Sequence, residues 1–173
     1  MTAFTSKVCI LGDFAVGKTS TAERFVNNQF SDKYLTTIGV KVDTKELELE
    51  AGVTLKLVLW DVAGADRFGE LELNYLRGAS GHLLVADGTR PETIGAARTL
   101  REQAIERYGE VPFVFLLNKA DLTDAWDVAD SGIAAIREEV GDVFLTSAKT
   151  GENVAEAIET LGRLIAEREF GSS

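Results

Sequence analysis

The stretch Gly12-Asp13-Phe14-Ala15-Val16-Gly17-Lys18-Thr19 does most to decide the fold. It follows an apolar run at 7–11 and opens a segment, 17–28, that we expect to be a helix. Its glycines let the backbone bend so that successive N–H groups point at an anion, and a helix N-terminus adds partial positive charge. This pattern is typical of a phosphate-binding P-loop. Taken by itself, it is also compatible with an ordinary glycine-rich turn.

In a P-loop the lysine reaches the β- and γ-phosphates of a nucleotide, and the hydroxyl of the last residue binds Mg²⁺. Lys18 and Thr19 stand at these two positions. The nucleotide contacts that we expect in this part of the chain are Asp13, Ala15, Val16, Gly17, Lys18, Thr19 and Ser20.

Short apolar runs alternate with amphipathic stretches along the chain, which predicts βαβ units and a mostly parallel sheet. We expect an α/β P-loop fold of one domain over 1–173, with helices on both faces of a six-stranded sheet that contains one antiparallel hairpin strand. In open sheets of this class ligands bind at the carboxyl ends of the strands. The predicted strands are 7–11, 40–50, 53–61, 82–87, 113–118 and 143–146.

A second motif, Asp61-Val62-Ala63-Gly64, follows one of these strands. A carboxylate at Asp61 could hold Mg²⁺ opposite Thr19, and Gly64 could donate its N–H to a γ-phosphate. Asp61 could instead be a turn residue or a helix cap. A threonine at 36 or 37 could also reach the ion while a γ-phosphate holds its loop closed.

The motifs Asn118-Lys119-Ala120-Asp121 and Ser147-Ala148-Lys149 point to a guanine base. One carboxylate, Asp121, can accept both neighbouring N–H groups of guanine, a pattern that adenine lacks. We expect Asn118 to tie its loop to the P-loop, Lys119 to lay its stem across the ring, and the Ala148 N–H to donate to the guanine carbonyl. The predicted base-side contacts are Asn118, Lys119, Asp121, Ser147, Ala148 and Lys149.

The composition narrows the class of protein further. The chain has 173 residues, 45% of them hydrophobic, and a net charge of −10, which argues against binding to nucleic acid or to anionic lipid. Its one cysteine, Cys9, lies in an apolar run, so we expect a buried thiol and a reducing compartment. We find no membrane-spanning run and no lipidation motif, and we expect a cytoplasmic monomer, peripheral to a membrane only if a lipid-bearing tail was removed.

Together these residues resemble the Ras superfamily of small GTPases, most closely its Rab and Rho branches, over about 7–168. Several further stretches carry the resemblance: Trp60-Asp61-Val62-Ala63-Gly64, Asp66-Arg67-Phe68, Tyr75-Leu76-Arg77-Gly78-Ala79 and Asp87-Gly88-Thr89-Arg90. The resemblance implies a G domain that cycles between GDP and GTP with Mg²⁺ and hydrolyses GTP.

The resemblance also assigns roles to the loops. It implies switch loops at 32–39 and 64–76 that bind effectors, exchange factors and activating proteins. It further implies that Phe30 packs against the base, that Tyr34 contacts the nucleotide, and that Thr37 rather than Thr36 is the metal ligand.

Two positions depart from the family pattern. Ala65 stands where the family has a glutamine that orients the attacking water, so no catalytic residue is matched. Phe14 stands where the family has glycine or serine, and its ring would crowd an incoming arginine finger. We therefore predict slow GTP hydrolysis or, as the alternative, a binding module that holds GTP persistently with negligible hydrolysis.

Each departure also allows a second interpretation. Ala65 could be a substitution introduced to lock the GTP state, and Phe14 could point into solvent. Asp66, Arg67 or Glu70 could also take over the positioning of water or charge.

Overall fold

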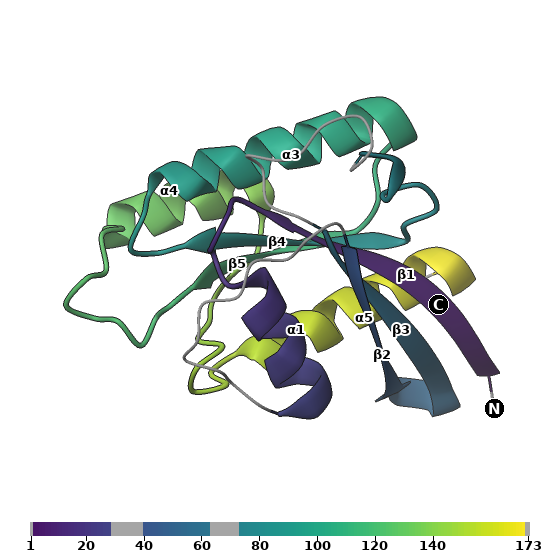
Figure 1. The fold of residues 1–173 in the computed structure, drawn as a ribbon. Coiled ribbons are helices and arrows are strands. Elements are labelled where there is room, and N and C mark those ends of the chain that lie inside the picture. Colours follow the sequence, from purple (N-terminus) through teal and green to yellow (C-terminus); the bar gives the residue numbers. More distant parts are fainter. Residues whose placement is uncertain (1, 29–39, 63–72, 172–173) are drawn as a thin grey trace.

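The computed structural model describes residues 2–28, 40–62 and 73–171 (Figure 1). The strands are β1 (Thr2–Gly12), β2 (Val40–Leu49), β3 (Val53–Val62), β4 (Gly81–Asp87), β5 (Phe113–Asn118) and β6 (Val143–Leu145). The helices are α1 (Lys18–Asn27), α3 (Glu92–Tyr108), α4 (Asp130–Val140) and α5 (Val154–Phe170), with a 3₁₀ turn at Glu50–Gly52. As predicted, helices and strands alternate from β4 onward, and β2 and β3 form a hairpin.

The strands form one six-stranded sheet in the order β2-β3-β1-β4-β5-β6. Only the β2–β3 pair is antiparallel, which confirms the predicted fold class. The first strand is longer than predicted, because its N-terminal part pairs with β3 from Thr2 opposite Val53 onward. The apolar run at 7–11 marks only the part of β1 that is also paired with β4.

Helices cover both faces of the sheet. Helices α1 and α5 lie on one face, and α3 and α4 lie on the other (Figure 1). Alternate side chains of β1 pack on opposite faces of the sheet: Val8 and Ile10 pack with α5, and Cys9 and Leu11 pack with α3. Such strands, buried on both faces, read as continuous apolar runs, which is why the sequence reveals them.

The predicted apolar face of α5 is buried as expected, through Val154, Ala157, Ile158, Leu161 and Ile165. Gly162 lies on the same face. A Cβ atom there would approach Leu47 to 3.2 Å and Leu55 to 3.3 Å. The missing side chain therefore lets α5 pack closely on β2 and β3.

Cys9 is fully buried in the layer between the sheet and α3. Burial raises the pKa of its thiol to about 12, so the thiol stays protonated and unreactive at neutral pH. The prediction that it serves as a small buried hydrophobic residue is confirmed. Among the described helices, none has the length and apolar character that crossing a membrane requires.

Candidate nucleotide-binding site

The P-loop motif connects the end of β1 to the start of α1. A Cβ at Gly12 would overlap the Val85 carbonyl of β4, and a Cβ at Gly17 would overlap the Asn118 side-chain amide. Gly17 also has a φ of 103°, a conformation that side-chain-bearing residues rarely adopt. The two glycines are therefore required by close approach of the neighbouring strands as well as by the bend of the loop.

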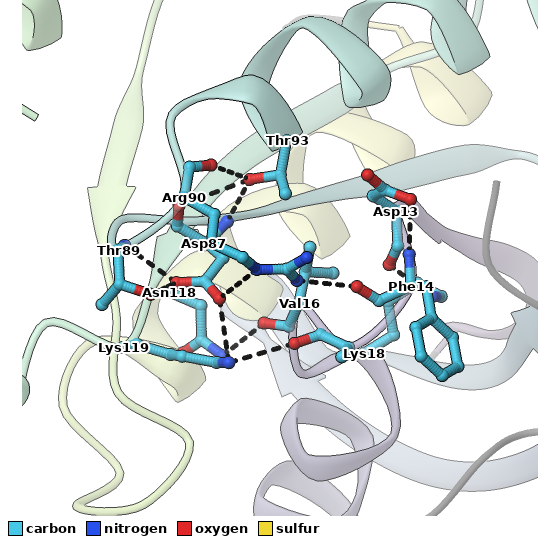
Figure 2. A network of polar contacts seen from close by, with 11 residues as sticks. Asp13, Phe14, Val16, Lys18, Asp87, Thr89, Arg90, Thr93, Asn118 and Lys119 are labelled. Carbon is cyan, nitrogen blue, oxygen red and sulfur yellow. Dashed lines mark hydrogen bonds and ion pairs between the residues drawn. The ribbon is translucent and has the colours of Figure 1, made fainter. Parts of the chain in front are cut away.

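Lys18 is the first residue of α1 and is buried. Its Nζ donates to the Asp13 carbonyl at 3.2 Å, so the ammonium lies over the loop. The Asp13 carboxylate accepts from the Phe14 N–H at 2.7 Å. Phe14 is half-buried, and its ring is directed away from the polar network beside it (Figure 2).

Thr19 and Asp61, the two predicted metal ligands within the described residues, lie side by side. The Thr19 hydroxyl donates to Oδ2 of Asp61, which is buried at the end of β3. A hydroxyl and a carboxylate are the hard oxygen donors that Mg²⁺ prefers, and Mg²⁺ commonly takes one or two protein ligands and completes its shell with phosphate and water. Among the described residues, no group of three or more His, Cys, Asp or Glu side chains is placed so that it could hold a metal ion.

Asn118 joins the P-loop to the base-side motifs. Its Nδ2 donates to the Val16 carbonyl at 3.0 Å, as the sequence predicted. Its Oδ1 accepts from the Thr146 hydroxyl and the Ala148 N–H, each at 3.2 Å. The Ala148 N–H, which we expected to donate to guanine, thus donates to Asn118. Its contact with a base stays a prediction.

The predicted specificity carboxylate Asp121 is held by the Ser147 hydroxyl at 2.8 Å. That hydroxyl also accepts from the Thr150 N–H at 3.0 Å, which fixes the turn at 147–150. On the other side, Arg24 of α1 donates to the Ala148 carbonyl at 2.8 Å and to the Lys149 carbonyl. The loop at 147–149 is therefore held by hydrogen bonds from both sides.

Lys119 makes contacts that the sequence did not reveal. Its Nζ donates to the Ala15 carbonyl at 3.0 Å and pairs with Oδ2 of Asp87 at 2.9 Å (Figure 2). Arg90 pairs with the same carboxylate oxygen through Nε at 3.1 Å. Its Nη2 reaches the Phe14 carbonyl at 2.7 Å. The predicted stacking of the Lys119 stem on a base stays a prediction.

Asp87 is the buried centre of this network. Burial by itself raises the pKa of its carboxyl, but hydrogen bonds from Thr89, Lys119 and Arg90 outweigh that effect and hold the pKa below its usual value. The carboxylate is therefore charged at neutral pH.

Sequence reasoning missed Asp87 and Arg90 as parts of the site, although the stretch that contains them carries the family resemblance. The available signal was a carboxylate at the end of a continuous apolar strand. Arg24 carried no such signal, because a single arginine on a helix predicts an exposed residue. The candidate positions that lie outside the described residues are Phe30, Tyr34, Thr36, Thr37, Gly64, Ala65, Asp66, Arg67 and Glu70.

The chain is similar to known proteins over most of its length. The sequence model of the Ras family matches residues 7–167. "GTP-binding protein YPTM1" of Zea mays is 37% identical over 169 residues, which are 96% of this chain and 80% of that protein. "Ypt/Rab-type GTPase YPT7" of Saccharomyces cerevisiae is 35% identical over 165 residues, 91% of this chain and 79% of that protein.

A third relative is "Ras-related protein Rab-27B" of Rattus norvegicus. It is 37% identical over 174 aligned positions, which cover 94% of this chain and 80% of the relative. These matches agree with the fold and with the described motif residues Thr19, Asp61, Asn118 and Ser147, which lie at one edge of the sheet. The chain belongs to the Ras family of small GTPases and is Rab-like.

Proposed function

We propose that the protein is a guanine-nucleotide switch that binds GDP and GTP with Mg²⁺ and hydrolyses GTP slowly. The observation that carries the proposal is the position of Asn118. Its hydrogen bonds to Val16, Thr146 and Ala148 join the phosphate-binding loop to both base-side motifs. One nucleotide could therefore span these motifs, with phosphates at 13–20 and the base at 118–121 and 147–149.

The proposal includes a Mg²⁺ ion. Thr19 and Asp61 would hold Mg²⁺, together with Thr37 from the first switch loop. When bound, Mg²⁺ neutralises charge on the β- and γ-phosphates. Lys18 would bind the same phosphates. The Gly64 N–H would donate to the γ-phosphate, so that the second switch loop changes conformation when this phosphate leaves.

Guanine specificity is tested at Asp121. Inosine diphosphate lacks the 2-amino group of guanine, so it leaves one carboxylate oxygen of Asp121 unpaired. We expect wild-type protein to bind GDP at least about tenfold more tightly than inosine diphosphate, and ADP more weakly than either. Asp121→Asn should weaken GDP binding and bring the GDP and inosine diphosphate affinities together.

Asp124→Asn is the matched control, because Asp124 is exposed three residues further along the same loop. Competition against a fluorescent GDP measures all affinities. Equal affinity of wild-type protein for GDP and inosine diphosphate would contradict the assignment of Asp121.

Slow hydrolysis rests on Ala65 and Phe14. Small GTPases without an activating partner already turn over on the order of 10⁻⁴ per second. A methyl group at 65 can orient no water, so we expect a rate at or below that value and weak stimulation by a partner that inserts an arginine. Single-turnover hydrolysis of bound GTP measures the rate, and fast GTP loss by the protein alone would refute the proposal.

The variant Ala65→Gln separates the possible causes. We expect it to raise the rate at least about tenfold if the missing amide limits turnover. Ala65→Leu is the control, since it adds similar bulk without an amide. If Ala65→Gln gives no gain, Phe14→Gly tests whether the ring at 14 is responsible instead.

A persistent GTP-bound module is the second candidate, and the same two positions favour it. The nucleotide that copurifies decides between the two: GDP supports the switch, and GTP supports the module. Binding of effectors, exchange factors and activating proteins at 32–39 and 64–76, a monomeric state and a cytoplasmic location stay predictions.

A further inference from the structure

Three successive carbonyl oxygens of the P-loop are each bound by a different side chain, one from the loop after β4 and two from the end of β5 and the residue after it. Arg90 binds the carbonyl of Phe14 at 2.7 Å, Lys119 that of Ala15 at 3.0 Å, and Asn118 that of Val16 at 3.0 Å. Figure 2 shows these side chains converging on the loop from one side. We call Arg90, Lys119 and Asn118 the outer clasp.

We propose that Arg90 is a positioning residue for the phosphate-binding loop, acting through the outer clasp on the direction of the Ala15 N–H. The inference rests on the proposed function and deepens it. In a planar trans peptide the C=O and the following N–H point in opposite directions. A carbonyl of Phe14 held toward Arg90 therefore aims the N–H of Ala15 to the opposite side, away from the clasp.

The same geometry applies to the next two peptides. Lys119 holds the Ala15 carbonyl and so directs the Val16 N–H, and Asn118 holds the Val16 carbonyl and so directs the Gly17 N–H. Ala15 and Gly17 have positive φ values of 60° and 103°, as expected of a backbone whose N–H groups converge on an anion. Arg90 thus fixes the first of three consecutive donors.

Arg90 is itself well fixed. Asp87 binds its Nε at 3.1 Å and is held in turn by the Thr89 N–H and hydroxyl at 2.8 and 2.7 Å. The Arg90 carbonyl accepts from the Thr93 hydroxyl at 2.7 Å, and the Arg90 N–H donates to the Asp87 carbonyl at 2.9 Å. A planar guanidinium can bind the carboxylate and the loop carbonyl at once with separate N–H groups, and an ammonium reproduces this geometry less well.

The outer clasp also holds Ala15 in a backbone conformation that a residue with a side chain rarely adopts. The left-handed conformation at Ala15 is unfavourable for any residue with a Cβ, and it persists only where surrounding contacts hold it. Arg90 and Lys119 bind the carbonyls on the two sides of that residue. If either contact is lost, the peptide group that it held can rotate. Its carbonyl oxygen would then point toward the phosphates and repel their oxygens.

The test compares nucleotide release by the full chain and its variants. Arg90→Gln should speed the dissociation of fluorescent GDP about tenfold, and Arg90→Lys should restore part of the loss. Arg98→Gln is the matched control: Arg98 lies on α3, is similarly exposed (41% against 36% for the Arg90 side chain) and pairs with Glu139 instead. We expect the control to stay within twofold of wild type.

A second readout separates positioning from general stability. Because Arg90 acts on the phosphate end, Arg90→Gln should leave the ratio of GDP to inosine diphosphate affinity unchanged. A ratio that changes as much as the release rate would overturn the inference, and so would a release rate within twofold of wild type. If Arg90→Gln does not fold by circular dichroism, Arg90→Lys decides, with faster release than wild type expected and an unchanged rate overturning the inference.

Failure of the proposed function is distinguishable in the same experiment. Wild-type protein that does not retain GDP would refute the guanine-nucleotide switch, and with it the role of Arg90. Wild-type protein that retains GDP, together with an Arg90→Gln variant that retains it equally well, would refute only the role of Arg90.

Discussion

At the scale of single residues, Asp87 shows how a buried charge is kept stable. Burial alone would favour the neutral acid, but Thr89, Arg90 and Lys119 all donate hydrogen bonds to the carboxylate. Removing one partner of a buried ionic network is costly, because the remaining charges lose their compensation. Asp87 therefore supports both the fold and the orientation of two cationic side chains beside the P-loop.

We expect Asp87→Asn to lower the free energy of unfolding by about 2 kcal/mol at pH 7. The folded-state pKa of Asp87 is lowered, so its stabilising effect is present above the unfolded value near pH 4 and is lost as pH falls through the folded value. Urea unfolding at a series of pH values should show the difference between wild type and variant shrinking below about pH 4. A difference that stays constant down to pH 3 (about one unit below the ordinary Asp value) would contradict this role.

At the scale of elements, β4 carries a titratable group inside the core. His82 is the second residue of the strand and is 4% exposed. Burial, and to a lesser degree the nearby Arg101 charge, lowers the pKa of the imidazole to about 4. The side chain is therefore neutral in the folded protein over the range in which it becomes charged in the unfolded chain.

Because the unfolded chain binds this proton more readily, acidification should destabilise the protein. Between about pH 6.5 and 4.5 we expect a loss of roughly 2 kcal/mol of unfolding free energy. His82→Gln should remove most of this dependence. His82 is the only histidine, so no other imidazole contributes in this window. Equal slopes for wild type and His82→Gln in chemical denaturation would show that His82 is not responsible.

At the scale of the whole molecule, the candidate site exists only when distant parts of the chain come together. The P-loop follows β1, Asp61 is the second-last residue of β3, Asn118 ends β5 and Ser147 follows β6. The parallel strands bring these ends to one edge of the sheet (Figure 1). A ligand that contacts all of them can bind the folded state but not the unfolded chain.

GDP with Mg²⁺ should therefore stabilise the protein by about 4 kcal/mol when the free ligand is 1,000 times its dissociation constant. A chelator such as EDTA should reverse part of this gain by removing Mg²⁺. ADP at the same concentration should change the melting temperature little. Differential scanning calorimetry measures all three, and an equal shift with ADP would contradict guanine selectivity.

Much of this arrangement could be predicted because it depends on local pattern. The central strands are continuous apolar runs, since both of their faces are buried, and α5 shows its core face in its periodicity. The bond between Asn118 and the P-loop was also predictable, because an amide after a buried strand faces the loops at the same edge. The full length of β1 was not, because its N-terminal part depends on pairing with β3.

The sequence by itself determined the ligand class, the fold class and the Ras-family resemblance, because each motif is a short run whose chemistry is local. Only the tertiary structure decided that Asp87, Arg90 and Lys119 meet behind the P-loop, where Arg90 and Lys119 bind carbonyls 76 and 104 positions away along the chain. Contacts over such separations depend on strand order and register, which local periodicity does not encode. The opening stretch 12–19 specifies a loop that can hold phosphate, and the ends of β4 and β5 fix the direction of its backbone.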